Sequence, residues 1–263
     1  MMKLSAICSF LESFAPVRLA EEWDNVGLLA GDAKEKVSRV MTCLTITPAS
    51  AAEAIEKKAE LIVVHHPLPF RPLKRLTTDS TAGRLLWQLA RAGIAIYSPH
   101  TAFDSAAAGI NQRLAEGLQL GNIIPLSPIA DDADELGAGR WGRLPAATRI
   151  ADFADEIKSF LSVDGLHIVG HPDSEIKFVA VACGSAGQFL DAARKAGCDA
   201  LVTGETNFHT CLEAEARGIA LFLPGHFASE RFAVEELAKI LAGEFGDLEF
   251  WASEREKDTR RWI

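Results

Sequence analysis

The sequence predicts an α/β fold with two lobes, in which helices cover mainly parallel sheets. Apolar runs typical of strands alternate with helical patterns along most of the chain, and hydrophobic residues make up 48% of the sequence, enough for a well-filled core. The order of a strand at 40–46, a helix at 49–59 and a strand at 61–64 is a βαβ unit. Such a unit implies parallel strands joined by a right-handed crossover.

The first half of the chain contains clear signals for helix ends. Thr47-Pro48 supplies a capping residue and a first-turn proline for the helix at 49–59. Gly93 ends a predicted helix at 82–92, which leads into a strand at 94–97. A further helix is expected at 105–116.

The second half continues the alternation after a stretch at 125–145 rich in Pro, Asp and Gly, where we expect a domain crossing. The expected elements are a helix at 150–160, strands at 166–169 and 178–182, a helix at 188–196, a strand at 200–203, a helix at 208–216, a strand at 219–223 and a helix at 229–241. The predicted lobes are 1–125 with 225–263, and 126–224.

Composition excludes several classes of protein. A formal net charge of −9 argues against extended nucleic-acid binding. The five cysteines form no C-x-x-C pair, so neither a disulfide framework nor a thiolate zinc site is indicated. The first 17 residues make a poor secretory signal, and no apolar run reaches the roughly 20 residues of a membrane span. We therefore expect a soluble, cytoplasmic protein.

Histidines follow three of the apolar runs, at the points where strands are predicted to end. His65-His66 follows the run at 61–64, and two further pairs, His100 with Asp104 and His226 with Glu230, stand four residues apart after later runs. The carboxyl edge of a parallel sheet is where open α/β proteins bind ligands. Imidazole and carboxylate ligands suit zinc, manganese, iron or nickel, and the sequence does not distinguish these ions.

Each pair also has a plain structural interpretation. His226 and Glu230 share one helix face if the helix begins there, but a capping or surface pair would look the same. Asp104 can equally be a helix cap beside a solvated His100. Adjacent strand residues point to opposite faces, so His65 and His66 either serve two ions or include one structural histidine.

Other groups have weaker signals. Arg71, Lys74 and Arg75 could hold a phosphate, although a solvated loop is the favoured interpretation. Glu205 and His209 stand four apart after a strand. The remaining candidates are read as structural or incidental: Trp23-Asp24-Asn25 as a packed turn, 184–187 as a tight turn, His167 and His171 as incidental, and Ser229 as an unlikely nucleophile because no base is paired with it.

Five segments together resemble the NIF-like dinuclear metal-centre proteins, also described as GTP cyclohydrolase I type 2 homologues. The segments are Trp23 to Leu28, Val64 to Pro67, His100 to Asp104, Leu201 to Glu205 and Gly225 to Glu230. They run from residue 23 to residue 230, so the resemblance covers nearly the whole chain. The chain is similar to the short form of the family, without the long central insert of some relatives.

The resemblance implies a centre of two divalent metal ions. The implied ligands are His65, His66, Asp104, His226 and Glu230, with Glu230 bridging. It also implies that His100 lies beside the ions and that Glu205 and His209 lie on the substrate side, with His100 or Glu205 moving protons during catalysis. The family further implies interlocked lobes and a ring-shaped homohexamer with its metal sites facing an inner cavity.

Three functional classes follow from such a centre. Two ions that share a carboxylate can lower the pKa of water and polarise an electrophile, so hydrolysis is the natural chemistry. The first class is a metal-dependent hydrolase of a small-molecule substrate, possibly a nucleotide, with GTP cyclohydrolase activity as the named example. The second is a dinuclear phosphoesterase. The third is a non-enzymatic metal-binding scaffold or regulatory protein.

Overall fold

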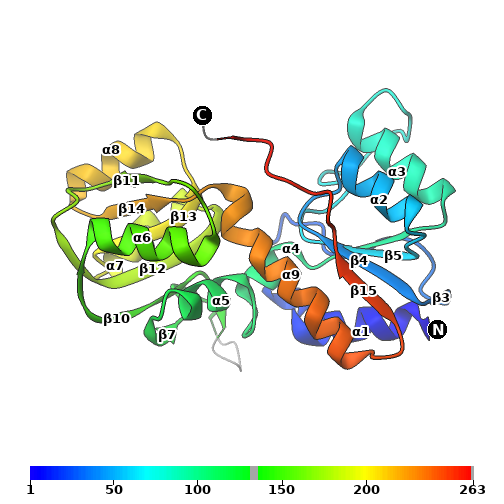
Figure 1. Cartoon of the computed structure of the whole chain (residues 1–263), viewed down its shortest axis with the longest axis horizontal. Coiled ribbons are helices and arrows are strands. Elements are labelled where there is room, and N and C mark those ends of the chain that lie inside the picture. The colour runs from blue at the N-terminus through cyan, green and yellow to red at the C-terminus, as the bar shows by residue number, and fades with distance from the viewer. Residues whose placement is uncertain (131–135, 262–263) are drawn as a thin grey trace. The chain divides into compact units, whose positions relative to one another are not determined.

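The computed structural model describes residues 1–130 and 136–261 of the chain. The chain divides into two compact units, each with its own sheet (Figure 1). Unit 1 contains Met1–Phe103 and Ala233–Lys257, and unit 2 contains Asp104–Phe232 and the segment from Asp258 onward. The predicted α/β class is confirmed. The lobe boundaries given above stay a prediction, and residues 131–135 of the expected domain crossing lie outside the described residues.

Unit 1 contains a five-stranded sheet in the order β15-β4-β5-β6-β2. Its strands are β2 (Gly27–Ala30), β4 (Arg39–Cys43), β5 (Leu61–Val64), β6 (Ala95–Ser98) and β15 (Glu249–Ala252). All neighbours are parallel except β2, which pairs antiparallel with β6. All four residues of β5 are buried, because a central parallel strand is covered on both faces. A separate small sheet pairs β1 (Met2–Lys3) with β3 (Lys36–Val37).

The helices of unit 1 cover both faces of this sheet. They are α1 (Leu4–Phe14), α2 (Pro48–Glu56), α3 (Thr81–Arg91) and part of α9 (His226–Glu244), with a short 3₁₀ turn at Val17–Leu19. The helices α2 and α3 pack on the face that presents Met41 and Ile62, while Thr42 on the other face donates a hydrogen bond to the Val234 carbonyl of α9 at 3.0 Å. Thr47 caps α2 and Pro48 opens it, as predicted from the sequence.

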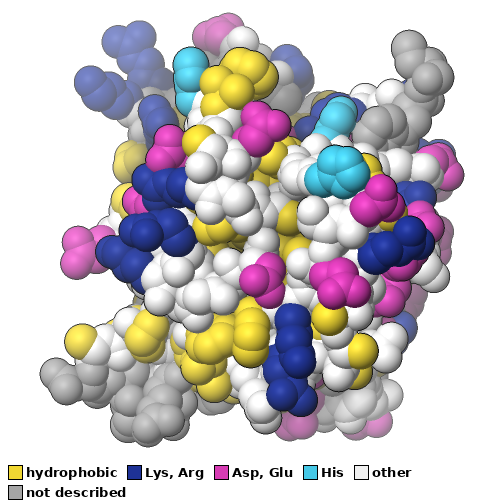
Figure 2. All heavy atoms as spheres, turned by 90° about the vertical axis from the view of Figure 1, so that its left-hand side faces the viewer, with side chains coloured by type: hydrophobic (Ala, Val, Ile, Leu, Met, Phe, Trp, Pro, Cys, Tyr) yellow, Lys and Arg dark blue, Asp and Glu magenta, His cyan; other side chains and the backbone are white. Residues whose placement is uncertain are grey.

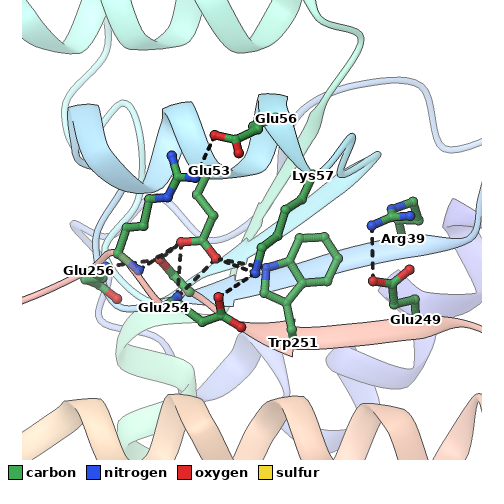
Figure 3. A network of polar contacts seen from close by, with 10 residues as sticks. Arg39, Glu53, Glu56, Lys57, Glu249, Trp251, Glu254 and Glu256 are labelled. Atoms are coloured by element: carbon green, nitrogen blue, oxygen red, sulfur yellow. Dashed lines mark hydrogen bonds and ion pairs between the residues drawn. The ribbon is translucent and has the colours of Figure 1, made fainter.

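A buried carboxylate ties the C-terminal segment of unit 1 to α2 (Figure 3). The side chain of Glu53 is 0% exposed and accepts hydrogen bonds from the Ser253 hydroxyl at 2.7 Å and the Arg255 amide at 3.0 Å. Trp251 Nε1 donates to it at 3.2 Å, and Lys57 lies 3.3 Å away. Burial alone would raise the pKa of Glu53, but these donors outweigh burial and lower it.

Unit 2 contains a six-stranded sheet in the order β11-β14-β13-β12-β10-β7. Its strands are β7 (Gly121–Ile124), β10 (Arg140–Arg149), β11 (His167–Val169), β12 (Glu175–Ser185), β13 (Ala200–Glu205) and β14 (Ala220–Leu223). The central strands β12, β13 and β14 are parallel, whereas β11, β10 and β7 pair antiparallel with their neighbours. The sequence did not predict these antiparallel flanks, because β10 mixes Gly, Pro and Arg with few apolar residues. A further small ladder pairs β8 (Ser127–Pro128) with β9 (Gly137–Ala138).

Helices also cover both faces of the sheet in unit 2. One face packs against α5 (Ile110–Gly117) and α6 (Ile150–Leu161), and the other against α7 (Leu190–Lys195) and α8 (Phe208–Arg217). On the face shown in Figure 2, basic, acidic and apolar side chains are interspersed. Among the described helices, none combines the length and the apolar character that a membrane span needs.

The single helix predicted at 105–116 is wrong, because the chain forms α4 (His100–Ser105) and α5 with a break between them. Arg140, 1% exposed, explains the break: its guanidinium donates to the carbonyls of Ser105 and Ala106, each at 2.9 Å. The Ala106 carbonyl also accepts from the Gly109 amide at 3.0 Å, which closes a turn of three residues rather than the four of an α-helix. The same side chain bonds the carbonyls of Gly137 and Gly139 at 2.7 Å. Burial lowers the pKa of Arg140 to about 10.

Candidate metal centre

Three histidines lie together at the strand ends of unit 1. His65 and His66 directly follow β5, and His100 opens α4 after β6. Each offers one ring nitrogen, and these nitrogens all lie within 4.8 Å of one another. The rings of His65 and His66 stand 5.0 Å apart between centroids, so the chain beyond β5 does not keep them on opposite faces. This group is able to hold a metal ion.

Hydrogen bonds at Nδ1 orient two of these rings. Thr45 Oγ1 lies 2.7 Å from His66 Nδ1, and Asp24 Oδ1 lies 2.7 Å from His100 Nδ1. The Asp24 side chain is 1% exposed and also accepts from the Thr101 amide at 3.1 Å. Burial would raise the pKa of Asp24, but the bonds from His100 and Thr101 lower it to about 2. An ionised Asp24 accepts from Nδ1–H, which leaves Nε2 of His100 as the nitrogen that carries a lone pair.

The Trp23-Asp24-Asn25 turn differs from the sequence interpretation. Asp24 and Asn25 do order the turn, since the Asn25 amide donates to Asp24 Oδ1 at 2.7 Å. The prediction that Trp23 packs is wrong, because its side chain is 62% exposed. The turn is fixed by polar bonds rather than by burial of the indole. Asp24 is therefore a member of the site that sequence reasoning classed as structural.

In unit 2, His226 and Glu230 lie on one face of the first turn of α9. The helix begins at His226, three residues before the predicted start. His226 Nε2 lies 3.2 Å from Glu230 Oε2. The hydrogen bond that His226 donates to Glu230 outweighs burial and, with the bond to Glu205, raises the pKa of His226 to about 9. Both side chains therefore offer the donor atoms that the sequence pattern predicts, on the same side of the helix.

Glu205 links His226 to the C-terminal segment. It stands at the end of β13, where Oε1 lies 3.0 Å from His226 Nδ1 and Oε2 accepts from Arg260 at 2.7 Å. Burial raises the pKa of Glu205, but the bonds from His226 and Arg260 outweigh it and lower the pKa. Glu205 also lines a cavity of about 500 Å³ together with His167, Arg260 and Arg261. His167, read from the sequence as incidental, thus shares a cavity with Glu205.

Asp104 lies beside a buried thiol. Cys183 Sγ donates to Asp104 Oδ1 at 3.2 Å, and Asn111 links the two residues by accepting from the Cys183 amide at 2.8 Å and donating to the Asp104 carbonyl at 3.1 Å. Burial, followed by the charges of Asp104 and Glu230, raises the pKa of Cys183 well above its ordinary value. The thiol is therefore neutral and acts as a hydrogen-bond donor to the carboxylate.

A glycine allows Glu230 to reach its position. Gly184 has φ +67, and a Cβ atom at this residue would lie 2.3 Å from Glu230 Oε1. Its amide donates to Ser229 Oγ at 3.0 Å, and this hydroxyl donates to the His226 carbonyl at 2.8 Å. Ser229 is 0% exposed and its hydroxyl bonds backbone groups, in agreement with the prediction that it is an unlikely nucleophile.

The remaining predicted residues lie at the surface. His209 is exposed on α8 and does not contribute to the lining of the cavity beside Glu205. Arg71, Lys74 and Arg75 are exposed on the loop that follows β5. His171 is 73% exposed in unit 2. Phosphate binding by the basic loop stays a prediction.

The donor set fits the divalent ions expected from the sequence. Imidazole nitrogens predominate in unit 1, and carboxylates with one imidazole in unit 2. Nitrogen and oxygen donors of this kind suit zinc, manganese, iron or nickel. The orienting bonds at Nδ1 of His66, His100 and His226 are the arrangement found around metal-binding histidines.

Comparison with known proteins identifies the family of the chain. The family model described as Duf34/NIF3 (NGG1p interacting factor 3) matches residues 2–259. A Clostridium perfringens protein named GTP cyclohydrolase 1 type 2 homolog is 36% identical, with 100% of both chains covered. NIF3-like protein 1 of Drosophila melanogaster is 33% identical over 91% of this chain and 82% of its own.

A solved structure has the same fold. The crystal structure of a Staphylococcus aureus protein superposes with a TM-score of 0.91 at 27% identity, covering 100% of this chain and 99% of that one. Family match, sequence identity and fold all extend over essentially the full length. The chain therefore belongs to the Duf34/NIF3 family.

Proposed function

We propose that this protein binds two divalent metal ions through His65, His66, Asp104, His226 and Glu230, and hydrolyses a nucleotide or a related small molecule. The observation that carries the proposal is the three-histidine group of unit 1, whose ring nitrogens lie within 4.8 Å of one another. The pair of His226 and Glu230, 3.2 Å apart, supports it independently from unit 2. The proposal requires both groups to serve the same pair of ions.

Bound divalent ions would supply Lewis-acid chemistry, which favours hydrolysis. The side chains of the protein set the donors for those ions. Asp24 holds Nδ1 of His100, and Glu205 holds Nδ1 of His226, so in both residues Nε2 is the nitrogen left for an ion or a proton. This gives His100 a proton-carrying role at Nε2 when it is not a ligand.

The role of Glu205 changes from the one inferred from the sequence. Its lowered pKa makes it a weak base, because His226 and Arg260 both stabilise the carboxylate form. A carboxylate held in this way orients His226 and faces the cavity lined by Arg260 and Arg261. We infer that Glu205 is a positioning residue on the substrate side.

GTP is the first substrate to test, since several relatives are named GTP cyclohydrolase 1 type 2 homolog. Purified protein is loaded with zinc, manganese, iron or nickel and its metal content is measured, and formate release from GTP is then followed. We expect about two ions per chain and formate release that His66→Ala abolishes. His171→Ala, an exposed histidine of unit 2, should match the wild type.

The outcomes separate the three functional classes. Formate at the same background rate in the wild type and His66→Ala would end the cyclohydrolase proposal. Hydrolysis of p-nitrophenyl phosphate without formate release would identify a phosphoesterase instead. Two bound ions with no turnover of either substrate would indicate a non-enzymatic metal-binding protein.

A further inference from the structure

Two exposed aromatic rings lie beside the histidines of unit 1. Trp23 is 62% exposed and Phe70 is 49% exposed, and their ring centroids are 5.9 Å apart at an angle of 50°. The ring of His100 meets Trp23 at 6.0 Å and Phe70 at 5.9 Å, in both cases edge to face. We name Trp23, Phe70 and His100 the aromatic corner.

Hydrogen bonds fix the loop that carries Trp23. The Glu21 amide donates to Thr101 Oγ1 at 3.0 Å, Asp24 bonds His100, and Asn25 Nδ2 donates to the Pro69 carbonyl at 2.9 Å. The last bond ties this loop directly to the residue that precedes Phe70. A scattered exposed aromatic residue needs no explanation, but two neighbouring rings on tethered loops present a fixed apolar surface.

Positive charge follows the corner in the sequence. Arg71, Lys74 and Arg75 come within five residues of Phe70, and all three are exposed. Aromatic side chains stack on nucleobases, and nearby cationic groups attract phosphates. An aromatic surface followed by cationic side chains therefore matches a ligand that carries both a planar ring and a phosphate.

We propose that the aromatic corner is a stacking platform for the base of a nucleotide, with the phosphate directed toward Arg71, Lys74 and Arg75. This inference rests on the proposed function, because it identifies the substrate class of that same site. Trp23 and Phe70 bind the base and take no part in bond making or breaking. Asp24 and Asn25 hold the platform beside His100.

The test compares ligands that contain one or both parts of a nucleotide. The Kd values of GMP, guanosine and ribose 5-phosphate are measured by calorimetry for the zinc-loaded and the chelator-treated protein. GMP should bind the wild type more tightly than either fragment. Trp23→Ala and Phe70→Ala should each raise the Kd of GMP about tenfold, the usual effect of removing one stacking ring.

Two control variants make the result specific. Trp23→Phe keeps a ring and should bind GMP within about threefold of the wild type, because stacking tolerates any aromatic face. Trp87→Ala removes a tryptophan on α3 that is 45% exposed and should leave the Kd unchanged. Lys74→Ala should weaken GMP and ribose 5-phosphate but spare guanosine.

Several outcomes would overturn the platform. The platform is rejected if Trp23→Ala does not weaken GMP binding, or if ribose 5-phosphate binds as tightly as GMP. It is also rejected if the wild type binds no GMP at millimolar concentration, or if a change of oligomeric state in Trp23→Ala accounts for its weaker binding. Zinc titration separates this failure from that of the proposed function. If Trp23→Ala binds both zinc and GMP as tightly as the wild type does, the platform is rejected and the metal centre is not. If the wild type binds no zinc, the metal centre is rejected, and the Kd of GMP for the chelator-treated protein still tests the platform.

Discussion

Both units use a carboxylate to hold a histidine, but the carboxylate side chain is almost fully buried in one unit and partly exposed in the other. In unit 1, the side chain of Asp24 is 1% exposed and lies 2.7 Å from His100 Nδ1. In unit 2, the side chain of Glu205 is 40% exposed and lies 3.0 Å from His226 Nδ1. The buried pair is shielded from water and salt, whereas the exposed pair is screened. The same chemistry should therefore contribute more to holding His100 in unit 1 than to holding His226 in unit 2, where Glu230 also contacts the ring.

The same contrast recurs where each unit holds the C-terminal segment. In unit 1, the side chain of Glu53 is 0% exposed and accepts hydrogen bonds from Ser253 and Arg255. In unit 2, the side chain of Arg260 is 54% exposed and bonds Glu205. Depth of burial, rather than the number of charges, should decide how much each contact contributes. The following experiments test that expectation in order of decreasing effect.

Removal of the buried anchor should have the largest effect. Glu53→Ala leaves buried donors such as the Ser253 hydroxyl and the Arg255 amide unsatisfied, so the free energy of unfolding should fall by about 3–5 kcal/mol. Urea denaturation measures the change. Glu56→Ala is the matched control, since this neighbour on α2 is 66% exposed and pairs with Arg255, and its loss should cost less than about 1 kcal/mol. Equal losses would contradict the role of burial.

Loss of the charge on Asp24 should weaken metal binding next. Asp24→Asn frees the Nδ1 tautomer of His100, a ring that lies in the three-histidine group able to hold an ion, so zinc affinity should fall about 10–100-fold. Competition with a chromophoric chelator gives the Kd. Asp32→Asn alters an exposed aspartate of the same unit and should bind zinc as the wild type does. An unchanged Kd in Asp24→Asn would show that this bond does not orient the ring.

Zinc affinity should also depend on pH through His226. Glu230 and Glu205 raise the pKa of this histidine from 6.5 to about 9, and an ion must displace its proton. Affinity should fall by up to about tenfold for each pH unit below about 9. The metal-free protein should show the opposite trend, since the stability contributed by protonated His226 is complete below pH 6.5 and is lost as the pH rises through about 9. A zinc Kd measured between pH 7 and 9 that stays constant would contradict this.

Disruption of the exposed pair should have the smallest effect. Arg260→Gln removes the partner of Glu205 Oε2, and zinc affinity should change by less than about fivefold at low salt. In 0.5 M salt the variant and the wild type should converge, because exposed charges are screened. Arg261→Gln, at the adjacent residue of the same segment, serves as control. A large loss of zinc affinity in Arg260→Gln that persists at high salt would show that this pair behaves like a buried one.

The main features of the fold and the predicted ligand positions could be read from local patterns. The run Leu61–Val64 marks a buried strand, and the strand end locates His65 and His66 without further information. Spacing of four residues likewise places His226 and Glu230 on one helix face. These inferences need only neighbours in the sequence.

The supporting residues could not be predicted because their partners are remote. Asp24 and His100 are separated by 76 residues, and Glu205 and Arg260 by 55. No periodicity links such pairs, so the local sequence around Asp24 indicates only a turn, and no pattern distinguishes Arg260. The break between α4 and α5 was missed for the same reason, since it depends on Arg140 from another element.

The glycine at 184 offers a way to move one carboxylate of the proposed metal centre without removing it. An added methyl group there would stand where Glu230 Oε1 now lies, and the cheapest relief is rotation of that flexible side chain. Gly184→Ala would thus displace one carboxylate at the modest cost of a left-handed alanine. If the proposed function holds, such a variant keeps the folded surface while altering the metal centre, so the partners that it still binds in cells recognise the surface rather than depend on turnover.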